Sequence, residues 1–294
     1  MKSLSKVFWI IAFSSLSFSS LHAEDDPFLI EASKRISENI ANLIPGEGVT
    51  EVEIQMQEHQ EPNFTILGVR DISKTENSNL FTQFSFHNND IGGDDRFIGN
   101  LGFGYRILTD DQSMMLGVNA FYDRDLQEDH ERGSLGFEAR GSALDFNFNY
   151  YEAFSAMQTV ETIEEQQVGG IDYNLTSQVP HMPWAKINYH GYEHHKDKAT
   201  KYTIGNIFSL EMAVNPSLQL DIDRDLSSGT NGNLWGVNLA FVYPPRSDNP
   251  TLVDGFLSDE IWHKENMQKK LSDKVRRNNN LVVEIQGAVI VTKQ

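Results

Sequence analysis

One pattern limits the folds open to this chain more than any other. From about residue 49, apolar and polar residues alternate with a period of two for nearly two hundred residues. Successive side chains of a β-strand point to opposite faces of the sheet, so this period predicts strands whose two faces meet different surroundings. In segment 96–108 the two faces are Phe97, Leu101, Phe103, Tyr105 and Ile107 on one side and Asn100, Gly102, Gly104 and Arg106 on the other.

The predicted strands are too long for an ordinary soluble sandwich. Twelve segments of roughly 9 to 13 residues alternate in this way, whereas strands in globular proteins average about five or six residues. A tilted strand needs about 9 to 11 residues to cross a bilayer, and only a closed sheet satisfies its backbone hydrogen bonds in lipid. Since bacterial outer-membrane barrels have an even number of strands, the sequence predicts an all-β fold, a twelve-stranded antiparallel transmembrane β-barrel over residues 49–244. The segments are 49–58, 63–71, 80–88, 96–108, 113–123, 132–141, 144–154, 167–177, 184–194, 201–213, 217–225 and 233–243.

The connections between these segments predict the orientation of the barrel. With the N-terminus in the periplasm, even-numbered strands end there in mostly tight connections, and odd-numbered strands end outside in mostly longer, more polar ones. Two connections, "ISKTENSN" at 72–79 and "SQVPHMP" at 177–183, are predicted to be exceptions on the short side.

The first 23 residues are typical of a secretory signal peptide. Lys2 and Lys6 precede the apolar run "VFWIIAF", which is too short to span a bilayer, and cleavage is predicted after Ala23. The formal charge is −18, and loss of the two lysines leaves about −20, which argues against nucleic acid as a partner. The sequence has no cysteine, so thiolate catalysis, Cys-ligated metal and a disulfide scaffold are excluded. No later apolar run is long enough for a transmembrane helix.

Two helical segments are predicted outside the strands. Residues 24–48 are predicted to be a short periplasmic segment with an amphipathic helix over 27–44, because apolar residues recur there at helical spacing. Residues 245–294 are predicted to form a lumenal helix and linker, with the helix over 257–277 and Ser258 as its N-cap. Acids in the first turn and bases in the last favour that helix. An extended apolar tail follows, and no passenger domain is expected.

The polar face of the predicted barrel would line its lumen. Acids on that face would make the lumen negative, and the predicted helix carries six Lys or Arg against four Asp or Glu, so it is suited to enter the lumen as a neutralising plug. No cofactor is expected. The predicted lumen-facing polar residues are Asn100, Arg106, Asn119, Glu138, Arg140, Asp145, Asn147, Asp221 and Asp223. The predicted plug and linker residues are Trp262, Lys270, Arg276, Arg277, Asn278, Asn279 and Asn280.

A cluster of carboxylates in "AFYDRDLQEDHERG", residues 120–133, raises two chemical alternatives. The repeated "DRDL" could bind a hard cation, but a calcium site needs about six to eight oxygen ligands, and the glycine and final glutamate of an EF-hand loop are missing. A surface hydrolase would place Asp and His acid/base groups at the outer rim. We interpret the cluster as the polarity of a solvated outer loop and predict no metal site and no enzyme. The residues considered are Asp123, Asp125, Asp129, His130, His194 and His195.

Two stretches resemble a known family of outer-membrane proteins. "LGFGYRILTDDQSMMLGVNAFYDRDLQEDHERGSLGFEARGSALDFNFNYYEAFS" is similar to the translocator barrel of the intimin and invasin family, the inverse autotransporters, and "DKVRRNNNLVVEIQ" resembles the helix and Asn-rich linker that follow that barrel. The resemblance covers about residues 30 to 286. It implies a twelve-stranded barrel with a periplasmic N-terminus, whose helix and linker occupy the lumen and carry the chain outward. A large adhesion domain and a periplasmic peptidoglycan-binding module, frequent in that family, have no counterpart here, so adhesion is not carried over.

These observations lead to one function and one alternative. We expect an outer-membrane translocation unit that threads its C-terminal segment to the cell surface, and the alternative is a passengerless structural barrel or a plugged, porin-like channel. The expected partners are outer-membrane lipid, the barrel assembly machinery and periplasmic chaperones, with any surface partner unknown. In the last strand, Gly236, Leu239 and Phe241 resemble the signal that this machinery reads, although ordinary strand patterning explains them equally well.

Overall fold

A computed structural model describes most of the chain. The described residues are 45–58, 60–91, 93–160, 162–194, 203–226, 233–247, 249–255 and 257–285, together with Arg35, Asn39 and the backbone of 288–290. The predicted signal peptide lies outside the described residues, and so does the predicted helix over 27–44 apart from Arg35 and Asn39, which are both helical.

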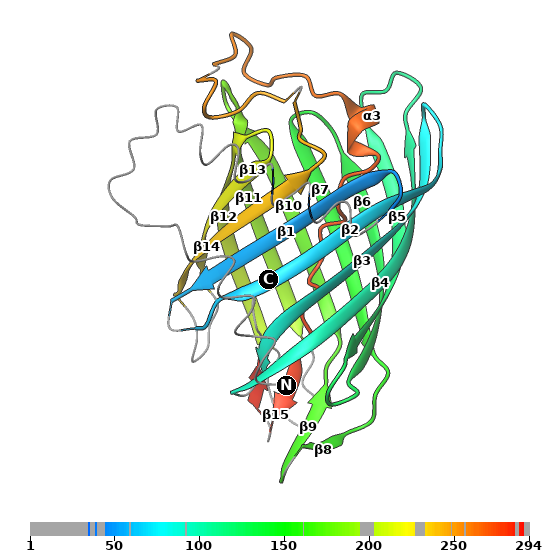
Figure 1. Ribbon diagram of the computed structural model, residues 1–294, viewed down its shortest axis with the longest axis vertical. Helices are drawn as coiled ribbons and strands as arrows, with labels where there is room; N and C mark the ends of the chain where they lie inside the picture. Colours follow the sequence, from blue (N-terminus) through cyan, green and yellow to red (C-terminus); the bar gives the residue numbers. More distant parts are fainter. Residues whose placement is uncertain are drawn as a thin grey trace.

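Twelve strands close into one antiparallel barrel (Figure 1). The barrel strands are β1 (Gly48–Gln57), β2 (Asn63–Lys74), β3 (Ser78–Ile91), β4 (Asp94–Leu108), β5 (Met115–Asp125), β6 (Glu131–Arg140), β7 (Leu144–Ala153), β10 (Gly170–Val179), β11 (Met182–His194), β12 (Thr203–Asn215), β13 (Leu218–Asp225) and β14 (Trp235–Tyr243). Strands that follow one another in the barrel pair with one another, and the ring closes where β1 pairs with β14, for example Val52 opposite Phe241. The predicted twelve-stranded barrel is therefore confirmed, and the predicted strand boundaries differ from these by only a few residues.

The two ends of the barrel differ in their connections. We call the end with connections 75–77, 109–114, 141–143, 180–181 and 216–217 the turn end, and the opposite end the loop end. The two predicted exceptions were wrong, because the flanking strands extend further than predicted and leave only 75–77 and 180–181 between them. Cross-strand pairing of Lys74 with Asn79 and of Val179 with Met182 accounts for these extensions.

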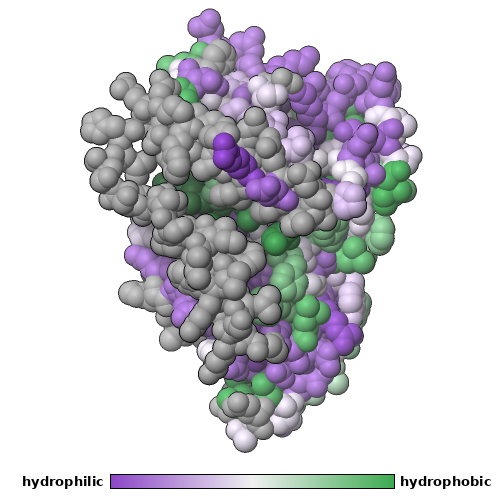
Figure 2. Space-filling model, viewed as in Figure 1, coloured by the Kyte–Doolittle hydropathy of each residue, from purple (hydrophilic) through white to green (hydrophobic). Residues whose placement is uncertain are grey.

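The outer wall of the barrel is apolar. Leu101, Phe103 and Leu135 are 50%, 55% and 64% exposed, although large apolar side chains are normally buried in soluble proteins. In Figure 2 green residues lie on the side of the barrel, below an upper end that is mostly purple. An apolar outer face of this kind matches the hydrocarbon of a bilayer.

No helix in the described part of the chain is long and apolar enough to cross a membrane. The helix predicted over 257–277 was wrong in extent. Only α3 (Met267–Lys270) is helical, and its N-cap is Asn266, whose side chain accepts a hydrogen bond from the Gln268 amide. Residues 271–273 form turns that continue α3, and residues 274–282 belong to no helix and no strand. Side chains of the barrel wall satisfy the backbone groups of this stretch, as described below.

A second, smaller sheet lies at the loop end and was not predicted. It contains β8 (Gln158–Val160), β9 (Ile163–Gln167), β15 (Val283–Ile285) and β16 (Ala288–Ile290), in the order β16-β15-β9-β8. The hairpin β8–β9 belongs to the connection between β7 and β10, whereas β15 and β16 come from the predicted apolar tail. Figure 1 shows this sheet at the lower end of the barrel, opposite α3.

The apolar core lies inside the barrel, in three clusters spaced along the C-terminal segment. The first joins Met267 and Leu271 to Leu108 and Met115 near the turn end. The second places Val275 against Leu67, Val69, Phe81 and Phe121. The third joins Leu281 and Val283 to Ile91 and Ile98 near the loop end. The C-terminal segment therefore supplies part of every cluster.

Candidate functional site

The candidate functional site is the lumen together with the stretch of chain inside it. We call residues 271–282 the lumenal linker. The chain crosses the turn end after β14, forms α3 and then descends through the barrel to β15 at the loop end (Figure 1). An extended segment has backbone donors and acceptors that must find partners when buried. The partners come from the wall.

Polar side chains on strands β3 to β7 bind the main chain of the linker. Asn and Arg residues donate to its carbonyl oxygens along its length, so the backbone is held without a helix. The donor pairs are Asn79 Nδ2 to Leu271 (2.9 Å), Arg106 Nη1 to Leu271 and Asp273 (3.0 and 2.6 Å), Arg140 Nη2 to Lys274 (2.8 Å), Asn149 Nδ2 to Arg276 (3.0 Å), Arg132 Nη2 to Asn278 (2.7 Å) and Asn100 Nδ2 to Asn279 (3.0 Å). In the other direction, the Val275 amide donates to Gln83 Oε1 (2.7 Å) and the Asn278 amide to Tyr151 Oη (2.8 Å).

Two basic side chains of the linker reach the opposite wall. Lys274 Nζ lies 2.8 Å from Glu51 Oε2 and 2.5 Å from Glu53 Oε1, both on β1. Arg276 binds Glu211 on β12 through two parallel hydrogen bonds of 2.5 and 2.6 Å, the geometry that a guanidinium and a carboxylate favour. These contacts fix side chains, and with them the position of the linker along the barrel axis.

Arg277 makes a fully buried ion pair with the wall. Its Nη2 is 2.6 Å from Asp123 Oδ2, and neither side chain is exposed. The same carboxylate oxygen lies 2.7 Å from Arg132 Nη2, and the Arg277 guanidinium stacks 4.3 Å from the ring of Phe121. Gly102 makes room for that ring, because a Cβ atom there would lie 2.3 Å from it. Sequence reasoning placed Arg277 in the plug but did not predict its partner.

The predicted lumen-facing residues take several different roles. Glu138 is bound by the wall residues Arg106 and Arg140 at 2.7 and 2.6 Å, so it is not neutralised by the linker. Asp145 is paired with Lys270 at 3.2 Å. Asp221 accepts hydrogen bonds from Gln219 and Asn238 and does not pair with the linker among the described contacts. The remaining predicted residues, buried in the wall, are Asn119, Asn147 and Asp223.

The predicted plug residues divide between the lumen and the turn end. Asn278, Asn279 and Asn280 lie in the lumenal linker and are buried. Trp262 was assigned to the plug, but it lies on the segment before α3 and is 43% exposed. The correction follows from the shortened helix, since the chain enters the barrel only from α3 onward.

A buried ion pair anchors the smaller sheet at the loop end. Arg96 on β4 binds Glu165 on β9 at 2.7 Å, and His130 Nε2 lies 3.2 Å from the same carboxylate. Burial raises the pKa of Glu165, but the hydrogen bonds and charge of Arg96 and the contact with His130 hold its pKa below the ordinary value of 4.5. Glu165 therefore remains ionised at neutral pH and keeps β9 at the barrel mouth, where β15 pairs with it.

The cluster at 120–133 was interpreted as solvated loop polarity, which was wrong for three of its residues. Asp123, Asp125 and His130 are fully buried, whereas Asp129 is exposed and pairs with Arg124 at 2.6 Å. Asp125 accepts hydrogen bonds from the backbone amides of residues 127 and 128 and lies 3.4 Å from Arg96. The inward face of β5 simply continues through both aspartates. The alternation of inward and outward residues along β5 was the sequence signal that could have predicted their inward orientation.

The alternatives that invoke catalysis or metal involve the same cluster. In the described ranges, no group of three or more His, Asp or Glu side chains is arranged to hold a metal ion. His194 is buried at the end of β11, and His195 lies outside the described residues.

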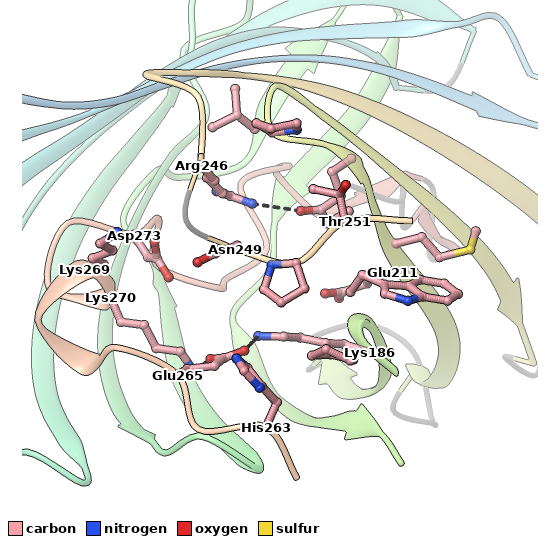
Figure 3. A pocket seen from close by; sticks show the side chains of 18 of the residues that line it. Lys186, Glu211, Arg246, Asn249, Thr251, His263, Glu265, Lys269, Lys270 and Asp273 are labelled. Atoms are coloured by element: carbon pink, nitrogen blue, oxygen red, sulfur yellow. Dashed lines mark hydrogen bonds and ion pairs between the residues drawn. The ribbon is translucent and has the colours of Figure 1, made fainter. Parts of the chain in front are cut away.

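A cavity of about 430 Å³ opens beside the linker at the turn end. It lies between strands β11 to β13 and the segment that crosses this end, with Glu265 between Lys186 and Lys270 at 2.8 and 2.5 Å (Figure 3). Burial raises the pKa of Glu265, and these two ammonium groups together bring it below its ordinary value. The lining includes Arg246, Thr251 and Asp273. Acids and bases of the cavity are thus largely paired with each other.

The three residues of the predicted assembly signal lie on β14. Gly236 faces inward, where a Cβ atom would lie 2.5 Å from Asp223 Oδ2. Leu239 and Phe241 are half-buried and share the other face with Trp235. They flank the seam at which β14 pairs with β1.

Comparison with known proteins agrees with this architecture. The model of the inverse autotransporter β-domain matches residues 30–279. This chain belongs to the inverse autotransporter β-domain family. As a member of that family, and as a closed barrel with an apolar outer wall, it is an outer-membrane protein.

Individual relatives give the same family. The chain is 32% identical over 115 residues to an attaching and effacing protein homolog of Escherichia coli K12, a match that covers 38% of this chain and 37% of that protein. It is 24% identical over 229 residues to the inverse autotransporter adhesin YeeJ of the same organism, covering 74% of this chain and 9% of YeeJ. The inverse autotransporter barrel described here thus spans less than half the length of these relatives.

A solved structure shares the fold. A membrane protein studied in work on in-meso crystallization superposes with a TM-score of 0.63 at 20% identity, over 81% of this chain and 100% of that one.

Proposed function

We propose that this inverse autotransporter barrel conveys its own C-terminal segment from the periplasm to the cell surface. The observation that carries the proposal is the course of residues 267–285, which enter the lumen at the turn end and pair with a surface hairpin at the loop end. Most connections of the loop end are longer and more polar than those of the turn end, which favours the outer side for the loop end. On this proposal the residues after the linker are exported, and the linker itself stays in the lumen.

A peptide tag after Gln294 tests the proposal on intact cells. We expect protease and antibody to reach the tag without opening the outer membrane. The same tag inserted after Glu128 at the loop end serves as the exposed control, and an insertion after Asp110 at the turn end serves as the protected control. If the tag after Gln294 behaves like the one after Asp110, the export proposal is wrong.

A plugged barrel that exports nothing is the second candidate. The filled lumen favours it, because linker residues occupy the barrel along its length and are bound by the wall on both sides. This candidate predicts protection of the tag after Gln294 together with low ion conductance. The tag experiment therefore separates the two candidates directly.

We propose that the barrel assembly machinery inserts this protein after periplasmic chaperones deliver it, and that Gly236, Leu239 and Phe241 on the closing strand contribute. Replacing Phe241 with Ser tests this, with Val237→Ser on the same face of β14 as the control. A selective loss of folded barrel for Phe241→Ser is expected, and equal losses would contradict it.

We also propose that the barrel catalyses no reaction, because Asp123 is bound by Arg277 and Asp125 accepts hydrogen bonds from backbone amides.

A further inference from the structure

The contacts of the lumenal linker fall into two chemical kinds that serve different steps. Resting on the proposed export function, we propose that the β3–β7 wall is a main-chain track that accepts an extended polypeptide of any sequence, whereas Lys274, Arg276 and Arg277 are an arrest signal that stops the chain in one register. The substrate class is therefore an extended peptide recognised by its backbone. Three basic side chains determine where the chain stops.

The track is defined by what its side chains touch. Asn79, Arg106, Arg140, Asn149 and Arg132 each donate to a carbonyl oxygen of the linker, as Asn100 does nearer the loop end. Every residue of every protein carries that carbonyl group. Donors of this kind discriminate little between side chains, and the extended peptide can exchange one carbonyl for another as it moves.

The track donors are also held by contacts within the wall that do not involve the linker. Arg106 and Arg140 share Glu138, and Arg132 is held by Asp123. Asn149 donates to Asp172 at 2.6 Å and Asn100 to Asp123 at 2.7 Å. The wall therefore presents oriented donors that need little ordering when a peptide passes, which lowers the entropic cost of binding.

The arrest contacts have the opposite character, because each needs a particular side chain at a particular height. Lys274 meets Glu51 and Glu53 on β1, and Arg276 meets Glu211 on β12. Arg277 inserts between Asp123 and the Phe121 ring on β5. A shift of one residue would reverse the directions of these side chains in an extended segment and break all three contacts together.

A cysteine pair can report the register, because the chain contains no other cysteine. Val283 lies directly opposite Gln167 in the paired strands β15 and β9, whereas Ile285 lies opposite Glu165. The full-length variant V283C/Q167C should therefore form a disulfide on oxidation, and I285C/Q167C, offset by two residues, should not. A tag after Gln294 on intact cells measures export in the same chains.

Three sets of full-length variants test the proposal. With K274Q/R276Q/R277Q we expect the tag to reach the surface as in the parent, with loss of the in-register disulfide and appearance of the offset one.

Removing Arg277 deprives the buried Asp123 carboxylate of a partner, which can disturb folding. A second set therefore leaves Arg277 in place: R276E should lose the register, and R276E/E211R should restore it. The third, N149L, removes one track donor and should lower the amount of exported tag without shifting the register. Heat-modifiable gel migration selects the folded protein in each sample.

The outcomes separate this inference from the export proposal. A protected tag in the parent chain contradicts export itself. An exposed tag with a single, unchanged register in K274Q/R276Q/R277Q and in R276E overturns the arrest signal. If N149L exports the tag at the parental level but shifts the register, then the wall donors fix the register as well, and the proposed separation of the two kinds of contact is wrong.

Discussion

The two ends of the lumen hold one continuous chain segment by different means. At the turn end, Lys270 bridges two carboxylates beside a cavity of about 430 Å³. At the loop end, Leu281 and Val283 pack on Ile91 and Ile98, all with 1% exposure or less, and β15 adds to the sheet of β9. The chain thus passes charged side chains beside a cavity at the turn end and closely packed apolar side chains at the loop end. Sealing is concentrated where the chain meets the loop end.

Removing the anchor of the loop end should have the largest effect. Glu165→Ala leaves Arg96 as a buried charge without its main partner, which costs about 3–5 kcal/mol. We expect that cost as easier local opening of the β8–β9 hairpin, measured by hydrogen exchange of the β9 amides. Asp94→Asn is the matched control, because Asp94 is 63% exposed and lies 3.7 Å from the same Arg96, and its loss should cost less than about 1 kcal/mol. Equal exchange in both variants would contradict the anchor.

Acid should reproduce part of the effect of Glu165→Ala. The folded pKa of Glu165 lies below its ordinary value of 4.5, so its stabilising contribution is complete above that pH and is lost as the pH falls through the lowered pKa. Protease cleavage within the β8–β9 hairpin should therefore stay constant above pH 4.5 and accelerate only below it. In Glu165→Gln this dependence should disappear, and its persistence there would assign the effect to another group.

Apolar packing should control ion flow at the loop end only. Leu281→Ala removes a fully buried side chain and should cost about 2 kcal/mol or more, and we expect it to raise single-channel conductance in planar bilayers. Met267→Ala is the matched control at the turn end, where the side chain is 2% exposed but an open cavity lies nearby. Its stability loss should be similar without a rise in conductance. A rise in both variants would contradict a seal confined to the loop end.

Charge loss at the turn end should have the smallest effect. Lys270→Gln leaves Asp145 and Glu265 without their shared cation, but both line a cavity that water can enter. We expect a loss of about 1 kcal/mol in the free energy of unfolding, measured in urea. A loss as large as that of Glu165→Ala would mean that the two ends are equally enclosed.

The sequence predicted the barrel because its two faces meet different solvents. Strand parity separates lipid-facing Phe103 from lumen-facing Arg106 without any tertiary information. Length and an even strand number then restricted the architecture to a membrane barrel. The same parity places Asp123, the last residue of the predicted strand 113–123, inward with Asn119, and it places Asp125 inward once the strand is extended by two residues.

Other features depend on contacts that a single sequence does not contain. The segment around Val275 has helical spacing and propensity, yet it is extended, because wall residues such as Arg106 and Asn149 bind its backbone. Strands β8 and β9 are too short to show a period. Pairing of β9 with β15 joins segments more than a hundred residues apart in the chain, and no local signal in either one specifies it.

The path of the linker is the central claim, and one distance tests it. In the cysteine-free chain, spin labels at K269C and I285C would lie at opposite ends of the lumen if the linker crosses it. Twelve residues span at most about 40 Å when fully extended, and the turns at 271–273 shorten this span. Pulsed electron spin resonance on the protein in bilayers should therefore give a distribution centred between about 30 and 40 Å. A distribution centred below about 25 Å would place both labels at the same end and contradict the account.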